Sequence, residues 1–443
     1  MHASVEHEKP APGGALEGVT FYHWLVVIIA SCGWLFDCMD QRLFVLARES
    51  ALKELLQNNA AALAALKTYI GYATTSMILG WATGGIIFGM LSDKIGRVKT
   101  MVATLIVYSG FTGLSGFAHS WVDFTIYRFL VGLGVGGMFG AATTLVAESV
   151  PGRFRSLALG SLQALSATGN IIGSLITLQI RPGAESLWGG HAGWRVLFFV
   201  GILPALLVIP IVFVLREPES WKRAKAEAGA AGTKKNIGSP LELFRDLRWR
   251  RNTIVGLLLG VSGMIGLWGI GFFSPELITL ALKGAPQAQV DAVRGWGTAL
   301  QDVGAFAGMM TFTAVASLLS RRVAFLGAFI LCLCTTAFVF YSLHSATDAY
   351  WMLPMMGFAQ LAVFAGYSIY FPELFPTRLR GTGVGFCYNT VRYVAAPFPV
   401  LMGMLSGIFS FRIAAIMMAS VYLLGIIALI WSPETKSKPL PED

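Results

Sequence analysis

The stretch LVVIIASCGWLFDCMDQRLFVLA, residues 25–47, decides the fold, because it is apolar along its length and yet contains two acids. At about 1.5 Å rise per residue, a helix of this length crosses the roughly 30 Å hydrocarbon core of a bilayer. Asp37 and Asp40 would then lie inside the membrane on one helix face. A carboxylate at that depth costs at least about 2.5 kcal/mol, so each acid must be neutral, paired or facing a polar cavity. The stretch predicts a spanning helix with a proton or cation site. The alternative is a helix-packing contact, for which Ser, Thr or Asn is more usual.

The composition places this helix in a polytopic membrane protein. Of 443 residues, 55% are hydrophobic and only 13% are charged, and the mean hydropathy is +0.65; these values lie far from those of soluble globular chains. An odd number of cysteines within apolar runs indicates free thiols, and no cluster of His, Cys and acids suggests a metal site. We therefore expect neither a metal nor a cofactor, with a proton gradient as the energy source. The cysteines are Cys32, Cys38, Cys332, Cys334 and Cys387.

Twelve segments of the chain are apolar enough to span a membrane. The longest polar break, residues 216–251, separates six spans from six, which predicts bundles over 1–215 and 252–443 joined by a linker loop. Residues 48–67 are rich in Ala, Leu, Lys and Glu, and we expect them to form a helix at the membrane surface. The expected spans are 22–46, 68–91, 100–119, 121–147, 156–180, 194–215, 252–281, 294–318, 322–343, 350–372, 381–407 and 411–432.

The distribution of Lys and Arg predicts the orientation. The termini and the loops on their side of the membrane hold 22 of the 33 basic residues, and the opposite loops hold six. This bias predicts a multi-pass protein of the plasma (inner) membrane with both termini in the cytoplasm. It also accounts for the pI near 9.4 without nucleic acid as a partner. We expect a monomer, with anionic lipids as partners of the 216–251 loop.

Motifs recur between the two halves of the chain. Glu148-Ser-Val-Pro-Gly-Arg-Phe-Arg follows the fourth expected span, and Glu373-Leu-Phe-Pro-Thr-Arg-Leu-Arg follows the tenth. Pro218-Glu219-Ser closes the sixth span, and Pro433-Glu434-Thr closes the twelfth. Two motif pairs at nearly one offset predict a duplicated six-span unit, and repeats of this kind place the binding site at their interface.

The loop between the second and third spans carries a family resemblance. Gly89-Met-Leu-Ser-Asp93-Lys-Ile-Gly96-Arg97-Val-Lys99 resembles the G-x-L-x-D-x-x-G-R-[KR] loop of the major facilitator superfamily. The resemblance implies an all-α polytopic fold, with twelve transmembrane helices as two six-helix pseudo-repeats, and a gating role for Gly89, Asp93, Gly96 and Arg97. The counterpart in the second half, residues 317–322, lacks the Gly and the Asp.

Further motifs resemble one branch of this superfamily. Residues 127–136 are similar to the fourth span of sugar porters and organic-acid transporters, and Asp37-Cys-Met-Asp40 resembles the D-x-x-D of aromatic-acid and sialate/lactate proton symporters. Residues 375–381 and 388–392 resemble the tenth and eleventh spans of those symporters. Residues 156–180 lack the Gly-Pro-rich signature of antiporters. The resemblance implies a transporter of small organic acids and not an enzyme.

The charges within the expected spans are candidates for proton coupling. Asp37 and Arg128 both lie about 10 Å from the outer membrane edge, so an ion pair between the first and fourth spans is feasible. Depth alone does not choose between Asp37 and Asp40; the resemblance to sugar porters favours Asp40. All six histidines lie at the termini or near span ends, so proton transfer falls to carboxyl groups. The predicted proton-coupling residues are Asp37, Asp40, Arg128 and Asp302.

Arg392 is the leading candidate for substrate binding. It lies near the membrane midplane, where it either pairs with Asp302 or binds an anionic ligand, and its planar fork suits a carboxylate. Arg42 either binds substrate or extends to the outer surface. The glycines of residues 132–140 fit close helix packing better than a phosphate loop. The remaining substrate-binding candidates, each of which can also serve as an interhelical hydrogen bond, are Arg128, Gln163, Asn170, Gln301, Gln360, Tyr388 and Asn389.

The hypothesis from the sequence is a proton-coupled symporter that moves a small anionic organic substrate by alternating access. The substrate could be a monocarboxylate, an aromatic acid or a sugar acid. A neutral sugar or polyol symporter is the alternative within the same class, and a nutrient sensor that does not transport is the alternative outside it. A membrane enzyme is disfavoured, because no nucleophile and base fall together at membrane depth.

Overall fold

The computed structural model describes residues 16–442 except 58 and 231–236; the N-terminal residues 1–15 and part of the predicted linker lie outside this description. All regular structure in the described part is helical, and helices cover every expected span. The helices of the first half are α1 (Phe21–Leu55), α2 (Ala60–Ala64), α3 (Leu66–Ile95), α4 (Arg97–Ser115), α5 (Trp121–Ser149), α6 (Gly152–Gln179), η1 (Trp188–Gly190), α7 (Gly193–Val200), η2 (Leu203–Leu207) and α8 (Val208–Val214).

The second half continues in the same way. Its elements are α9 (Glu219–Ala230), α10 (Glu242–Arg245), α11 (Leu247–Met264), η3 (Ile265–Ile270), η4 (Gly271–Phe273), α12 (Ser274–Ala281), α13 (Gln287–Leu318), α14 (Arg321–Ser342), α15 (Ala346–Leu374), η5 (Thr377–Leu379), α16 (Arg380–Ala395), α17 (Phe398–Ile408), α18 (Phe411–Ala419) and α19 (Val421–Ala428). Among the described residues, eight helical segments are long and apolar enough to cross a membrane. The other four expected spans correspond to α4, α6, α13 and α16–α17.

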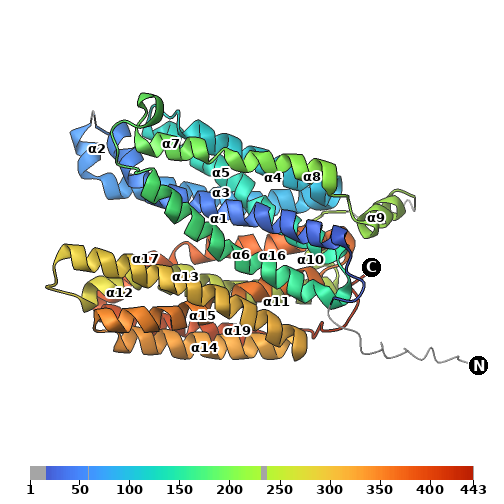
Figure 1. Cartoon of the computed structure of the whole chain (residues 1–443). Helices are drawn as coiled ribbons and strands as arrows, with labels where there is room; N and C mark the ends of the chain where they lie inside the picture. The colour runs from blue at the N-terminus through green and yellow to red at the C-terminus, as the bar shows by residue number, and fades with distance from the viewer. Residues whose placement is uncertain (1–15, 58, 231–236, 443) are drawn as a thin grey trace, which may run out of the picture.

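The helices form two bundles that lie side by side (Figure 1). The first bundle contains α1–α8 and the second contains α11–α19, with α6 and α16 between them. Across this interface α3 packs on α16, and α6 packs on α13 and α15. The predicted boundaries at 215 and 252 stay a prediction. We call the end of the molecule where α1 begins and α19 ends the terminal end, and the opposite end, where α2 and α12 lie, the far end.

Four expected spans are interrupted, which the apolar pattern did not predict. The seventh span contains a π-helix at η3 and one 3-10 turn at η4, and α12 then starts with a proline, Pro275, in its first turn. The eleventh span breaks at Pro397, which lacks the N–H that a continuous helix needs. The sixth span changes to a 3-10 helix at η2, and the twelfth breaks at Ser420. Hydropathy detects the length of such a span, but not a local change in its hydrogen bonding.

Glycines along facing helices allow close contact between their backbones; we call such a row of glycines a seam. Gly132 and Gly136 of α5 meet the backbone of α3 at Met77 and Trp81, so the packing interpretation of the 132–140 run is confirmed. A second seam crosses between the bundles, where Gly89 of α3 touches the backbone of α16. Small residues at four-residue spacing let two helices approach to backbone contact.

Candidate functional site

Helix α1 presents two different faces to its surroundings. Trp34, Cys38 and Arg42 are four residues apart and form one stripe, which meets α6 and the second bundle. Asp37 and Asp40 are fully buried and meet α4 and α5 inside the first bundle. The predicted proton site and the interface between the bundles therefore lie on neighbouring faces of one helix.

Asp40 and Arg128 form an ion pair between the first and fourth spans; membrane depth had made such a pair feasible for Asp37, and the structure forms it with Asp40. Nη1 of Arg128 lies 4.0 Å from Oδ2 of Asp40, and both side chains are fully buried. Nη2 of Arg128 donates to Ser115 Oγ, and its guanidinium carbon lies 4.7 Å from the centroid of the Phe198 ring. Because these contacts all lie within the first bundle, they favour a charge-pairing role for Arg128 over direct contact with a substrate between the bundles.

Asp37 lies one turn away in a different environment. Neither of its carboxylate oxygens lies within hydrogen-bond geometry of a partner among the described residues, although the Tyr108 side chain on α4 is close enough to interact with it. No cation pairs with it in that part of the chain. A buried carboxylate without a cation or donor is costly in its charged form, so this environment suits a neutral carboxyl group.

Arg392 lies at the interface between the bundles and is only 4% exposed. Its Nη1 donates to the Tyr388 carbonyl at 2.7 Å and to Asn389 Oδ1 at 2.8 Å, while its buried Nε has no partner in the described structure. No carboxylate of the described residues lies within ion-pair distance. The sequence had left open a pair between Arg392 and Asp302; the structure excludes it, because Asp302 is bonded elsewhere.

Aromatic side chains from both bundles surround Arg392. Its guanidinium carbon lies 3.9 Å from the Trp81 ring and 4.7 Å from the Tyr388 ring. Trp34 contacts Trp81 edge-on, and Phe139 stacks on Tyr388 with the ring centroids 3.8 Å apart. We call Arg392 and these four rings the aromatic chamber. It combines one cation with flat aromatic rings, which are the features expected of a site for an organic carboxylate.

The other polar candidates are dispersed. Gln360 is buried within the second bundle, where its Nε2 donates to Thr336 Oγ1 at 3.2 Å. Gln163 is buried on α6, and its Oε1 has no partner among the described residues. Asn170 and Gln301 are half-buried on α6 and α13. No hydrogen bond in the described structure links these four to Arg392. Of the neutral candidates, Tyr388 and Asn389 are the two that the fold brings to Arg392.

Arg42 and Asp302 form an ion pair between the bundles. Nη2 of Arg42 on α1 donates to Oδ2 of Asp302 on α13 at 2.9 Å. Their side chains are 27% and 19% exposed, so the pair is only partly screened from the surroundings. Arg42 therefore neither extends to the membrane surface nor joins the aromatic chamber in this structure. A separation of 260 residues explains why sequence spacing did not predict the pair.

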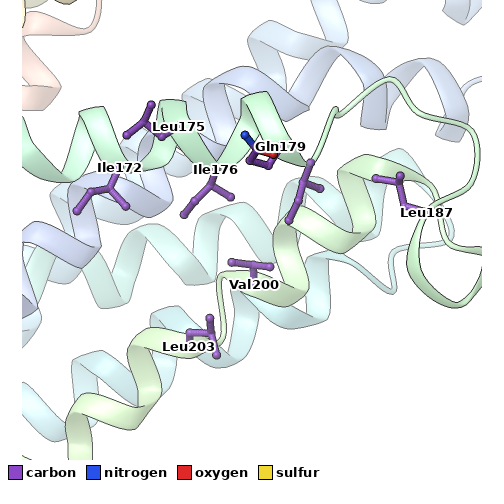
Figure 2. A pocket seen from close by; sticks show the side chains of 8 residues that line it. Ile172, Leu175, Ile176, Gln179, Leu187, Val200 and Leu203 are labelled. Atoms are coloured by element: carbon purple, nitrogen blue, oxygen red, sulfur yellow. The ribbon is translucent and has the colours of Figure 1, made fainter.

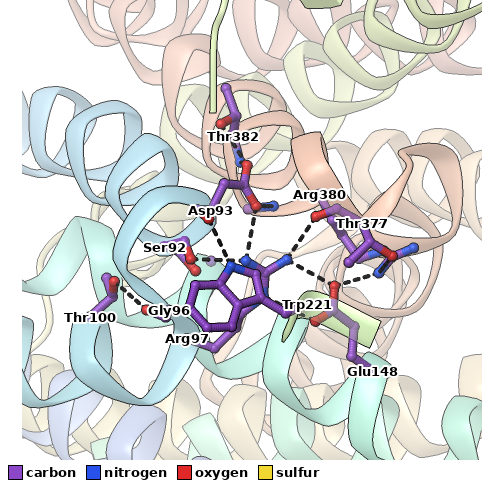
Figure 3. Close-up of polar contacts among 12 residues, drawn as sticks. Ser92, Asp93, Gly96, Arg97, Thr100, Glu148, Trp221, Thr377, Arg380 and Thr382 are labelled. Carbon is purple, nitrogen blue, oxygen red and sulfur yellow. Dashed lines mark hydrogen bonds and ion pairs between the residues drawn. The ribbon is translucent and has the colours of Figure 1, made fainter. Parts of the chain in front are cut away.

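At the terminal end, Asp93 closes the interface between the bundles. Its carboxylate accepts hydrogen bonds from the backbone N–H groups of Gly381 and Thr382 at 3.0 and 2.8 Å, and from Thr382 Oγ1 at 2.7 Å. These N–H groups belong to the first turn of α16, where a helix favours a negative charge. The predicted gating loop thus binds the second bundle through Asp93 (Figure 3).

Arg97 extends this closure through a shared acid. It forms a two-point contact with Glu148, with Nε at 3.0 Å and Nη2 at 2.9 Å, and Arg380 of the second bundle binds the same carboxylate. Nη2 of Arg97 also donates to the Thr377 carbonyl at 2.8 Å. All three charged side chains are fully buried. Removing one partner from such a buried network is strongly destabilising, because the remaining charge is left unpaired.

Glu217, at the start of the linker, binds the gating loop that contains Arg97. Its carboxylate accepts from the backbone N–H groups of Arg97, Val98 and Lys99 at the start of α4. Gly96 makes this possible, since its φ of +118° favours glycine and a Cβ there would meet Glu217. The repeat had aligned Glu219 with Glu434. The structure instead shows Glu217 binding α4, whereas Glu219 is exposed and pairs with Lys222.

Glu434 performs the matching task in the second bundle. It accepts from the backbone N–H groups of Arg321 and Arg322 at the start of α14. Burial alone would raise the pKa of Glu434, but bonds from Lys436, Arg322 and Arg321 hold that pKa below its usual value. Arg321 in turn pairs with Glu373 at 2.8 Å and donates to Ser156 of the first bundle. The second half therefore keeps the Arg–Glu part of the gating loop, although the Gly and Asp are missing.

A groove on the side of the first bundle lacks the chemistry of an acid-binding site. It has a volume of about 650 Å³ and lies between α6 and α7 (Figure 2). Seven of its eight lining side chains are apolar and the eighth is Gln179; the apolar ones are Ile172, Leu175, Ile176, Ile180, Leu187, Val200 and Leu203. No charged side chain lines it.

The sequence analysis missed the tryptophans of the aromatic chamber. Trp34 and Trp81 are buried, yet their indole N–H groups have no partner among the described residues. Tryptophan in the middle of an apolar span is unusual, because its N–H prefers a polar partner near the membrane interface. That signal was available in the sequence, but it does not say that the two rings meet.

The fold and these contacts define the class of protein: a multi-pass helical membrane protein with a buried arginine and aromatic rings between two bundles. Residues 31–398 match the family model described as Major Facilitator Superfamily, so the chain belongs to this superfamily. It is 30% identical over 365 residues to the cis,cis-muconate transport protein of Acinetobacter baylyi. This alignment covers 82% of this chain and 84% of that relative. It is 28% identical over 354 residues to the sialic acid transporter NanX of Escherichia coli, covering 78% of this chain and 80% of NanX.

A solved structure confirms the fold. The proton:xylose symporter XylE aligns with a TM-score of 0.73 at 18% identity, over 95% of this chain and 98% of XylE. The prediction of the major facilitator fold, with organic-acid transporters as relatives and sugar porters as structural neighbours, is therefore confirmed, as is the expectation of a transporter instead of an enzyme.

Proposed function

We propose that this protein is a proton-coupled symporter that moves small organic acids by alternating access. The observation that carries the proposal is Arg392, a buried cation without a carboxylate partner among the described residues, located between the two bundles. An unpaired arginine at that depth is expensive, and a substrate carboxylate would complete its hydrogen bonds. The relatives support this choice, because two of them are named as transporters of muconate and of sialic acid.

The composition of the aromatic chamber favours, as substrate, an acid that carries a flat, unsaturated or ring-shaped part. Trp34, Trp81, Phe139 and Tyr388 offer ring surfaces to a ligand held at Arg392. A neutral sugar would find fewer hydrogen-bonding side chains there, since the polar candidates Gln360 and Gln163 lie elsewhere. Recognition would then combine charge pairing at Arg392 with stacking on the rings.

Asp40 is the proposed proton carrier. It is fully buried and lies 4.0 Å from Arg128, at the limit of an ion pair. Burial favours the neutral acid, whereas the nearby guanidinium favours the carboxylate, so a small movement of α1 against α5 can shift the balance between them. Asp37 keeps its place as the alternative, because it is equally buried and has no cation beside it.

The coupling of proton uptake to substrate binding follows from the two faces of α1. A substrate that binds at Trp34 and Arg392 shifts the helix that also carries Asp40, so proton uptake and substrate binding can act on one rigid element. In the loaded carrier, Asp40 is protonated and Arg392 is paired with the substrate carboxylate, while Arg128 keeps its bond to Ser115. We propose that this loaded state is the one able to close on one side and open on the other.

The proposed orientation places the terminal end in the cytoplasm and the protein in the plasma (inner) membrane. The excess of Lys and Arg in the loops of that end supports it. The closed network around Asp93 then lies on the cytoplasmic side, and Arg42 and Asp302 lie toward the outside. We expect a monomer that contacts anionic lipids through the basic loop.

A thermal-unfolding panel on the purified protein tests the substrate class. A ligand that binds the folded state raises the unfolding temperature, by an amount that grows with the logarithm of its concentration divided by its Kd. We expect aromatic and unsaturated carboxylates to stabilise the protein more than saturated sugar acids, and neutral sugars to have no effect. Stabilisation by neutral sugars alone would contradict the organic-acid proposal and favour a sugar symporter.

A further inference from the structure

Arg42 lies above the aromatic chamber on the route to the far end. It follows Trp34 by two helical steps of four residues, which places it about 12 Å farther from the terminal end on the same face of α1. The stem of Arg42 lies against Gly173 of α6, where a larger residue would collide with it. The guanidinium is thereby aimed across the interface at Asp302 of α13.

The contacts between the bundles differ at the two ends. At the terminal end, Asp93, Arg97 and Glu148 all bond across the interface and are fully or largely buried. Toward the far end, Arg42 and Asp302 bond across it while partly exposed. A buried network is costly to break, whereas a partly exposed ion pair is weak and can open by thermal motion.

We propose that Arg42 and Asp302 form the outer gate of the substrate route. The ion pair closes the path between the aromatic chamber and the far end, and it must separate each time substrate enters from that side. This inference rests on the proposed function, because a gate has a role only in a carrier that alternates its access. In this assignment Asp302 holds the two bundles together, and the coupled proton does not reside on it.

Cys38 is a native reporter for this gate. It lies one turn below Arg42 on the same stripe of α1, beside Gly169 of α6, and it is 8% exposed. Trp34 and Arg42 lie about one turn to either side of Cys38 along α1, which places the thiol between the gate and the aromatic chamber. A reagent that arrives from the outside therefore has to pass the gate before it reaches Cys38.

The first experiment measures labelling of Cys38 from outside by a membrane-impermeant maleimide. The protein is reconstituted with Cys38 as its single cysteine, so that no substrate needs to be known. We expect Asp302→Asn to raise the labelling rate about fivefold, which corresponds to about 1 kcal/mol at a factor of ten per 1.4 kcal/mol. Arg42→Gln should have the same effect, and the double variant should add little to either single one.

Glu54→Gln is the matched control. Glu54 pairs with Arg195 at 2.9 Å, with side chains 33% and 19% exposed, but both residues belong to the first bundle. Its neutralisation removes an ion pair of similar length and exposure without touching the interface. Labelling of Cys38 should stay at the parental rate. If Asp302→Asn also stays at that rate, or Glu54→Gln rises equally, the gate assignment is wrong.

The second experiment asks whether the pair has to separate during transport. Cysteines replace Arg42 and Asp302 in a background without native cysteines, and a short thiosulfonate cross-linker joins them. We expect proton-driven uptake of a stabilising acid to stop and to recover after reduction. Uptake that continues through the cross-link would overturn the gate. Failure of every acid to be transported, with Cys38 labelling still responsive to Asp302→Asn, would instead contradict the proposed function and leave the gate standing.

Discussion

The guanidinium carbon of Arg392 lies 3.9 Å from the centre of the Trp81 ring, so a cation of one bundle rests on an aromatic side chain of the other. This contact crosses the interface between α16 and α3. A carboxylate that binds Arg392 must share the guanidinium with Trp81 or displace it. Substrate binding is therefore connected directly to the relative position of the two bundles.

Replacing Arg392 by Lys tests the carboxylate contact. The substitution keeps the charge but loses the planar fork that can bind both oxygens, so the affinity for a stabilising acid should fall about tenfold for each 1.4 kcal/mol lost. The measurement is a ligand titration followed by thermal unfolding. Arg412→Lys is the control, because Arg412 donates to the backbone carbonyls of Phe340 and Leu343, within the second bundle. Unchanged affinity in Arg392→Lys would reassign this arginine to a structural role.

Asp40→Asn separates coupling from binding. The variant resembles a permanently protonated carrier, so the loaded state should still change its conformation and exchange internal for external substrate. Accumulation driven by a pH gradient needs the proton to leave, and it should be lost, while exchange becomes less sensitive to pH. Both are measured in proteoliposomes.

Asp37→Asn is the companion to that experiment. If Asp40→Asn accumulates substrate normally and Asp37→Asn does not, the proton carrier is the neighbouring acid. If both variants accumulate normally, α1 does not carry the proton. Asp302 would then become the leading candidate, against the gate assignment made above.

Asp93→Ala should slow conformational cycling more than it weakens binding. The variant leaves the N–H groups of Gly381 and Thr382 without their acceptor, so the closed state at the terminal end loses stability. We expect the transport rate to fall while the ligand-induced shift in unfolding temperature is retained. Asp123→Ala serves as the comparison, since Asp123 caps α5 through Ser120 within the first bundle. It should lower stability without changing transport per folded molecule; equal effects of the two variants would argue against a gating role for Asp93.

Glu217 and Glu219 should differ in their importance for stability. Glu217→Ala removes the acceptor for three backbone N–H groups at the start of α4, which is expected to cost about 1–3 kcal/mol. Glu219→Ala removes an exposed contact with Lys222, and the unfolding temperature should not change measurably. Thermal unfolding in detergent distinguishes them. The reverse order would support the alignment that the sequence repeat suggested.

Most of the fold could be predicted from the sequence because hydropathy records membrane thickness directly. The helix boundaries of α5 and α15 differ from the expected spans by four residues or fewer at each end. The interruptions in the seventh and eleventh spans could not be predicted in the same way. A span keeps its apolar composition when its hydrogen bonds change to π or 3-10 spacing, so η3 leaves no mark on a hydropathy profile.

The candidate site was predictable in its parts but not in its assembly. Helical spacing placed Asp37 and Asp40 near each other, and membrane depth made a pair between Asp37 and Arg128 feasible, but the acid at ion-pair distance from Arg128 is Asp40. Arg392, in the same bundle, was the partner considered for Asp302, and the pair with Arg42 of the adjacent bundle was not anticipated. Recognising that pair requires the packing of the two bundles, with α6 against both α1 and α13, which no local pattern records.

The seam between Gly89 of α3 and Gly385 of α16 consists of backbone against backbone. At this one point no side chain has to move when the two helices tilt against each other, so the glycine pair itself offers little steric resistance. Most of the resistance to movement then comes from the polar bonds around it. Substitutions at these two positions should therefore be tolerated according to the volume of the new side chain and not its polarity. Even one added methyl group should keep the two bundles from coming into contact here.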